Sequence, residues 1–109
     1  MKTIIVHLKH LFCTFIFLSA IFNLSAQKVL SGVVKDAQQR PVAYCSIGIK
    51  NSKVATVTNE HGGFKLIIPD SLINSNLIFS AIGFINKQLS PNEINTLKDG
   101  VIITLQEKI

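Results

Sequence analysis

The stretch ATVTNEHGGFKLII, residues 55–68, decides the fold. Side chains on both sides of its polar centre alternate with a period of two, which is typical of half-buried β-strands. The centre, residues 59–63, ends in glycines, which take the left-handed backbone conformation of short turns without steric penalty. The stretch therefore predicts a β-hairpin, with strands over 54–58 and 64–68 and with Phe64, Leu66 and Ile68 facing inward.

The same period continues outward from this hairpin, in short apolar runs separated by Gly, Pro, Asn and Asp. Such runs predict β-strands, and five more are expected at 29–35, 43–49, 77–81, 85–89 and 101–105. On the strand at 43–49, one face is expected to be core and carries Ala43, Cys45, Ile47 and Ile49. Seven strands at this spacing predict an antiparallel all-β domain in which two sheets pack face to face as a sandwich.

Helix is expected at one place in this domain. Ser90 stands three residues before Glu93, with Pro91 between them. A serine cap, a proline at the first helical position and a glutamate at the third are the signature of a helix start. One helical turn through Leu97 is therefore predicted.

The first 26 residues have a different character. Lys2 and Lys9 precede an uncharged stretch of 14 residues, Leu11–Leu24, and small residues follow it. This order predicts a secretory signal peptide, helical and cut after Ala26, because a membrane-spanning helix needs roughly 20 apolar residues. We expect 1–26 to be the signal peptide and 27–109 to be one domain, exported and without a stable membrane span once the signal is removed.

Composition excludes two classes of protein. The 109 residues are 48% hydrophobic and 16% charged, which is too apolar for a disordered chain. Loss of Lys2 and Lys9 lowers the net charge from +5 to +3, and the remaining basic residues are scattered without interleaved aromatic residues. A nucleic-acid-binding protein needs a basic patch, so we expect no nucleic acid partner.

Catalysis and metal binding are also not expected. In 27–109, His61 is the only histidine and Cys45 the only cysteine. A zinc site needs three or four ligands, more than one histidine and one cysteine supply. A hydrolytic triad needs a histidine base, and His61 is expected in a tight turn. Cys45 is better explained as a core residue, and it has no second cysteine for an internal disulfide. We therefore expect no catalytic, metal-binding or cofactor-binding residue and no cofactor.

Four segments together carry a family resemblance: Ser31–Asp36 (SGVVKD), Arg40-Pro41-Val42, Ala55–Phe64 and Leu77–Phe84 (LIFSAIGF). Over about Val29–Leu105 the chain resembles the carboxypeptidase-regulatory-like domain, although Arg40 and Ala55 stand where glycines are usual. The resemblance implies a seven-stranded Greek-key β-sandwich of the transthyretin (prealbumin) type. It also implies an exported protein of Bacteroidetes-type bacteria, since such modules often stand at the front of TonB-dependent outer-membrane receptors.

These observations lead us to expect a non-catalytic module of the bacterial cell envelope, in the periplasm, associated with the outer membrane, or secreted. Its expected partner is another envelope protein, bound through exposed strand edges unless Lys28, Lys35 and Lys53 guard them. One alternative is a small carbohydrate-binding module, with Tyr44, Asn59 and Glu60 as candidate ligand contacts. Another is the truncated front end of an outer-membrane receptor.

Overall fold

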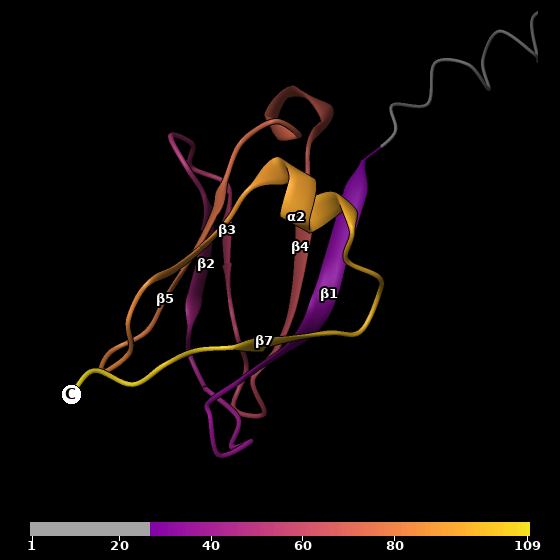
Figure 1. Cartoon of the computed structure of the whole chain (residues 1–109). Coiled ribbons are helices and arrows are strands. Elements are labelled where there is room, and N and C mark those ends of the chain that lie inside the picture. Colours follow the sequence, from indigo (N-terminus) through magenta and orange to yellow (C-terminus); the bar gives the residue numbers. More distant parts are fainter. Residues whose placement is uncertain (1–26) are drawn as a thin grey trace, which may run out of the picture.

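Two β-sheets face each other in the computed structural model, which describes residues 27–109 (Figure 1). Seven strands are present in this part of the chain, so the predicted all-β sandwich is confirmed. β4 lies beside β1 in one of the sheets, the return connection that defines a Greek key. The signal peptide expected at 1–26 lies outside the described residues.

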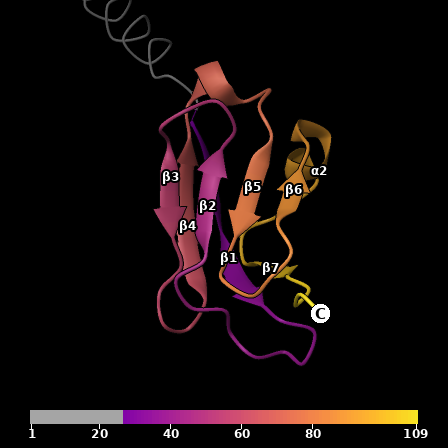
Figure 2. The same ribbon diagram turned by 90° about the vertical axis from the view of Figure 1, so that its left-hand side faces the viewer.

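The three-stranded sheet has the order β4-β1-β7, and the four-stranded sheet has the order β3-β2-β5-β6. Figure 2 shows the four-stranded sheet in front of the three-stranded one. The strands are β1 (Lys28–Lys35), β2 (Ser46–Ile49), β3 (Ala55–Val57), β4 (Gly63–Ile68), β5 (Leu77–Ser80), β6 (Lys87–Leu89) and β7 (Val101–Thr104). The short helices are η1 (Asp70–Leu72) and α2 (Pro91–Asn95).

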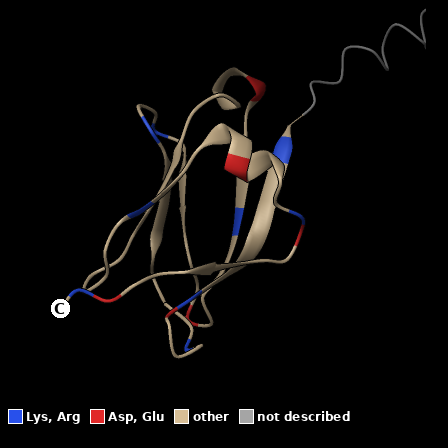
Figure 3. Cartoon of the chain, in the orientation of Figure 1, with Lys and Arg blue, Asp and Glu red and all other residues tan. Residues whose placement is uncertain are grey.

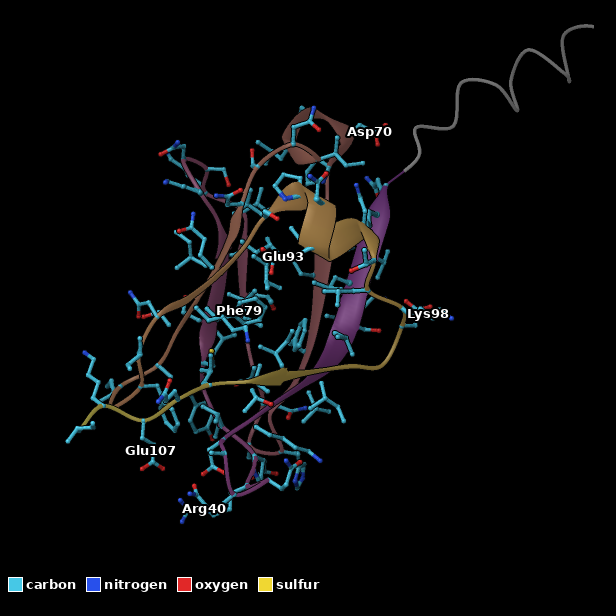
Figure 4. All side chains as sticks on the ribbon, viewed as in Figure 1. Arg40, Asp70, Phe79, Glu93, Lys98 and Glu107 are labelled. Carbon is cyan, nitrogen blue, oxygen red and sulfur yellow. The ribbon has the colours of Figure 1, made fainter. Side chains whose placement is uncertain are left out.

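The core lies between the sheets, where the inward side chains of both interdigitate. Phe64 of β4 and Phe79 of β5 meet there edge to face, with ring centroids 6.0 Å apart and planes at 79°. Phe79 lies between the two layers in Figure 4. The predicted inward face of β4 is confirmed, since Phe64, Leu66 and Ile68 are all buried. The other buried apolar residues are Leu30, Val34, Val42, Cys45, Ile47, Ile49, Leu77, Phe79, Leu89, Ile94, Ile103 and Leu105.

The predicted hairpin between residues 54–58 and 64–68 is wrong in its pairing. β3 pairs with β2 and β4 pairs with β1, so the turn between β3 and β4 carries the chain from one sheet to the other. The turn itself has the expected local form, because the N–H of Gly62 donates to the carbonyl of Asn59 at 3.0 Å and Gly62 is left-handed with φ of 77°. Local turn geometry therefore does not decide which sheet the following strand joins.

A contact between Gly62 and the central strand β1 places β4 in the three-stranded sheet. The carbonyl of Gly62 accepts a hydrogen bond from the N–H of Val34 at 2.8 Å, which extends the β1–β4 ladder by one pair. A Cβ at Gly62 would stand 2.5 Å from the carbonyl oxygen of Val34. Both the left-handed conformation and this close approach require glycine.

The expectation of a wholly antiparallel domain is also wrong, because β7 runs parallel to β1. Parallel neighbours cannot be joined by a tight turn, and here the other five strands lie between β1 and β7 in the chain. The chain reaches β7 from β6 of the other sheet through α2. α2 starts with the predicted capping box of Ser90 and Glu93, with Pro91 in its first turn. Its Ile94 is buried, so this short helix helps to close the core as well as to connect the two sheets.

Several strands are shorter than predicted. The strand expected at 43–49 begins only at Ser46, because Tyr44 has φ of 58° and a left-handed residue interrupts the extended backbone. Its buried side is nevertheless as expected at Cys45, Ile47 and Ile49, and Ala43 is half-buried. The strand expected at 85–89 begins at Lys87, since the N–H of Ile85 donates to the carbonyl of Gln106 instead.

We predict that Gly62→Ala destabilises the domain much more than Gly83→Ala. Gly83 has nearly the same backbone angle, φ of 86°, but a Cβ there would meet no atom within 4 Å. Strain alone should cost about 1–2 kcal/mol at Gly83, and the added contact with Val34 should cost about 1–3 kcal/mol more at Gly62. Urea unfolding of both variants measures the difference, and equal losses would contradict the role of the Val34 contact.

Candidate functional site

A buried hydroxyl, that of Thr58, anchors one side of the turn between the sheets. Thr58 is 1% exposed; its Oγ1 donates to the carbonyl of Val42 and accepts from the N–H of Cys45, both at 2.8 Å. Its own N–H donates to the carbonyl of Cys45 at 2.9 Å, and its carbonyl accepts from the N–H of Tyr44 at 3.1 Å. Thr58 thus holds residues 42–45 in the bend that precedes β2.

The three candidate ligand contacts lie around this anchor. Tyr44 is 71% exposed. Its backbone N–H is bonded to the carbonyl of Thr58, the residue that precedes Asn59 in the chain. Asn59 is committed to the turn, since its Oδ1 accepts from the N–H groups of His61 at 3.0 Å and Gly63 at 2.9 Å. Glu60 faces solvent with its Oε1 3.5 Å from Nε2 of His61. The prediction that Tyr44, Asn59 and Glu60 contact a ligand stays a prediction.

Asp36 organises the turn that follows β1. Its Oδ1 accepts from the N–H groups of Gln38 at 2.9 Å and Arg40 at 2.8 Å, and its Oδ2 accepts from Nε of Arg40 at 2.8 Å. Burial raises the pKa of Asp36, but these hydrogen bonds and the Arg40 charge outweigh it and hold the pKa below its usual value. Arg40 also reaches Glu107 at 3.2 Å, at the end of the sandwich where Figure 4 labels both residues.

The residues considered for catalysis and metal binding stay apart. Cys45 is fully buried, and burial raises the pKa of its thiol, which disfavours the reactive thiolate. His61 is exposed in the turn beside Glu60. Within residues 27–109, no three His, Cys, Asp or Glu side chains are grouped so that they could hold a metal ion. Nor does any helix in this described part have the length and apolar character that crossing a membrane requires.

The outer edge of β4 is the longest strand edge that the described chain leaves unpaired. β4 has six residues, whereas the other edge strands, β3, β6 and β7, have three, three and four. An open depression of about 620 Å³ lies beside this edge, lined among others by Thr56 and Val57 of β3 and by Gly63 and Lys65 of β4. Edges of this length are surfaces on which another strand can pair.

None of the three lysines expected to guard strand edges lies in an edge strand. Lys28 and Lys35 are on β1, the central strand of its sheet, and Lys53 is in the loop between β2 and β3. Lys28 instead donates from Nζ to the carbonyl of Ile94 at 2.9 Å and so ties β1 to α2. The lysine in the middle of the β4 edge is Lys65, visible as the blue segment of β4 in Figure 3.

A comparison with protein-family models matches residues 30–109 to the CarboxypepD_reg-like domain. The chain belongs to this family. The match starts within β1 and runs past β7, so it covers both sheets and confirms the resemblance noted in the sequence. A search of curated proteins finds no match.

In this CarboxypepD_reg-like domain, the sequence indicated some of the surface features and missed others. Tyr44, a candidate ligand contact, is exposed, but its left-handed backbone had no signal in the sequence. The free edge of β4 was hidden by the expected hairpin, which would have paired β4 with β3. A sequence pattern shows which residues face inward, but it does not show which strand lies alongside.

We predict that Thr58→Val destabilises the domain by about 2–4 kcal/mol. Valine fills nearly the same volume, but the buried carbonyl of Val42 and N–H of Cys45 lose their partner, and each costs about 1–3 kcal/mol. Thr58→Ser keeps the hydroxyl and should cost only about 1 kcal/mol for the lost methyl group. Urea unfolding of the two variants tests this, and a serine variant as unstable as the valine variant would contradict it.

We predict that protonation of Asp36 destabilises the domain in acid. Its pKa in the folded chain lies below the unfolded value of 3.8, so the ionised carboxylate stabilises the fold above that pH. This stabilisation is lost as the pH falls below 3.8 and through the folded pKa. Asp36→Asn should therefore have a lower urea midpoint than the wild type at pH 7, and the difference should shrink below pH 3.8. A difference that is constant with pH would contradict the prediction.

Proposed function

We propose that this protein is an exported, non-catalytic module of the bacterial cell envelope that acts by binding another envelope protein. The observation that carries the proposal is the unpaired edge of β4, a row of backbone groups on a strand that is otherwise firmly held by β1. Pairing with an added strand is a common way for a sheet to bind an extended segment of a partner. Location in the periplasm or at the outer membrane is part of this proposal.

Three further observations support a binding role over an enzymatic one. The family is that of a regulatory-like domain. The single thiol of residues 27–109, on Cys45, is buried with a raised pKa, and the histidine, His61, is exposed in a turn. Asp36, the acid with a lowered pKa, is committed to the backbone of its own turn. Neither the buried thiol of Cys45 nor the committed carboxylate of Asp36 is therefore placed to react with a substrate.

Support for export comes from the sequence. The basic start, the uncharged stretch Leu11–Leu24 and the small residues up to Ala26 have the order of a secretory signal. A domain without an internal disulfide depends on its core in such a compartment, and fifteen buried apolar residues supply that core.

Crosslinking in the native host tests the proposal. The chromosomally tagged protein is crosslinked in intact cells and recovered from envelope fractions, and mass spectrometry identifies what it retains and where its chain begins. We expect one dominant envelope partner and an N-terminus at Gln27.

Recovery of the tagged protein alone would contradict the proposal and would favour the carbohydrate-binding alternative. That alternative has one structural argument, the exposed ring of Tyr44 held by the backbone bond to Thr58. A chain recovered from the cytoplasm with residues 1–26 intact would contradict export.

A further inference from the structure

The orientation of the backbone groups of β4 follows from its register with β1. The N–H of Val34 donates to the carbonyl of Gly62, and this pair continues the register in which Gly32 faces Phe64 and Leu30 faces Leu66. In an antiparallel ladder, hydrogen-bonded pairs alternate with pairs that are not bonded to each other. Phe64, Leu66 and Ile68 therefore point their N–H and C=O groups toward β1, and the residues between them point theirs outward.

Gly63 confirms this alternation independently. Its N–H donates to Oδ1 of Asn59 at 2.9 Å, and its carbonyl accepts from the N–H of Asn59 at 2.9 Å. Both groups therefore point away from β1, and Asn59 occupies them as a partner strand would. Asn59 is a cap on the first outward position of the edge.

Beyond this cap, two residues present free backbone groups. The N–H and C=O groups of Lys65 and Ile67 point outward by the same alternation, and none of the four has a hydrogen-bond partner within residues 27–109. Their side chains are exposed on the outer face of the three-stranded sheet, with Ile67 at 47%. Ile67 also has an exposed apolar neighbour there, since it stands opposite Val29 in the β1–β4 register.

The charge on this face is unbalanced. Lys65 lies opposite Ser31, and neither β1 nor β4 contains an acidic residue. The strands β1 and β4 accordingly show no red segment in Figure 3. An opposite charge placed directly across from Lys65 would stabilise a strand pair there, and a like charge would destabilise it.

We infer that the edge of β4 binds an extended segment of a partner protein, antiparallel, with the order apolar, apolar, acidic along the partner chain. The first of these residues pairs with Ile67, the second lies beside Leu66 and the acidic residue pairs with Lys65. Four backbone hydrogen bonds to Lys65 and Ile67 hold the segment, and Asn59 ends the binding site at Gly63. This inference rests on the proposed function and specifies the partner.

A second copy of the chain does not satisfy these requirements. If β4 pairs with itself about a two-fold axis at residue 65, Lys65 faces Lys65. An axis at residue 66 places each Lys65 opposite Ile67, and an axis at residue 64 places it opposite Gly63. No self-pairing gives the lysine an acid, so a foreign segment with a carboxylate fits the edge better than a dimer does.

Selection from a display library of random octapeptides tests the inference, with the protein immobilised in the form that its host exports. We expect enrichment of peptides with the order apolar, apolar, acidic. Ile67→Pro removes an outward N–H without disturbing the β1 ladder and should weaken binding of the enriched peptides about tenfold. Ile67→Thr, which keeps the N–H in a residue that favours strands, should retain most of the binding.

The charge is tested separately with Lys65→Glu, for which the selected peptides should change from acidic to basic at the third position. Lys50→Glu makes the same change in net charge at an exposed position outside β4 and should leave the selection unchanged. Thermal unfolding checks that all four variants fold.

Peptides that bind Ile67→Pro as tightly as the wild type would overturn the inference, because another surface would then be responsible. Elution as a dimer that Ile67→Pro dissociates would overturn it in favour of a second copy. If crosslinking in the host finds a partner that the Ile67→Pro variant still retains, the proposed function stands and the edge is excluded. Failure of both the crosslinking and the selection would remove the function together with the inference.

Discussion

The structure depends on the chain changing sheets between Thr58 and Gly62. On one side the buried hydroxyl of Thr58 holds the approach to β2, and on the other the carbonyl of Gly62 accepts from Val34 in β1. Five residues thus carry bonds to both sheets. Because buried polar groups are costly when unpaired, the Thr58 bonds and the apolar core exclude most other positions for this turn. The chain then enters β4, whose Phe64 meets Phe79 of the other sheet in the core.

Surface properties follow from the same change of sheet. Because β4 pairs with β1, the strands β3 and β4 are edges of different sheets. The outward backbone groups of Lys65 and Ile67 are therefore without partners in the described part of the chain. Asn59 covers only the first outward position of that edge, at Gly63. A hairpin in its place would have paired β3 with this edge of β4. The feature that makes the fold possible is thus also the one that leaves an edge on which a partner can pair.

Much of this fold could be predicted from the sequence, because inward and outward faces are a local property of each strand. The buried side of β4, the left-handed Gly62 and the capping box of Ser90 and Glu93 all follow from residues a few positions apart. The partner of β4 and the direction of β7 could not be predicted, since the bonds within the turn at 59–63 are compatible with a hairpin or a change of sheet. Tyr44 takes a conformation that its own chemistry disfavours, because Thr58 binds its backbone.

The parallel pairing of β1 with β7 has a consequence for how the molecule folds. It pairs Gly32 with Val101 and Lys35 with Thr104, so the first strand of the domain gains its second neighbour only from the last strand. Contacts between such distant positions are slow to form, because a long loop must close before they stabilise anything. During synthesis β1 is made early, but one side of it stays open until β7 has emerged. A chain of this topology reaches its native state late, and until β7 docks the open side of β1 is exposed to wrong strand pairing.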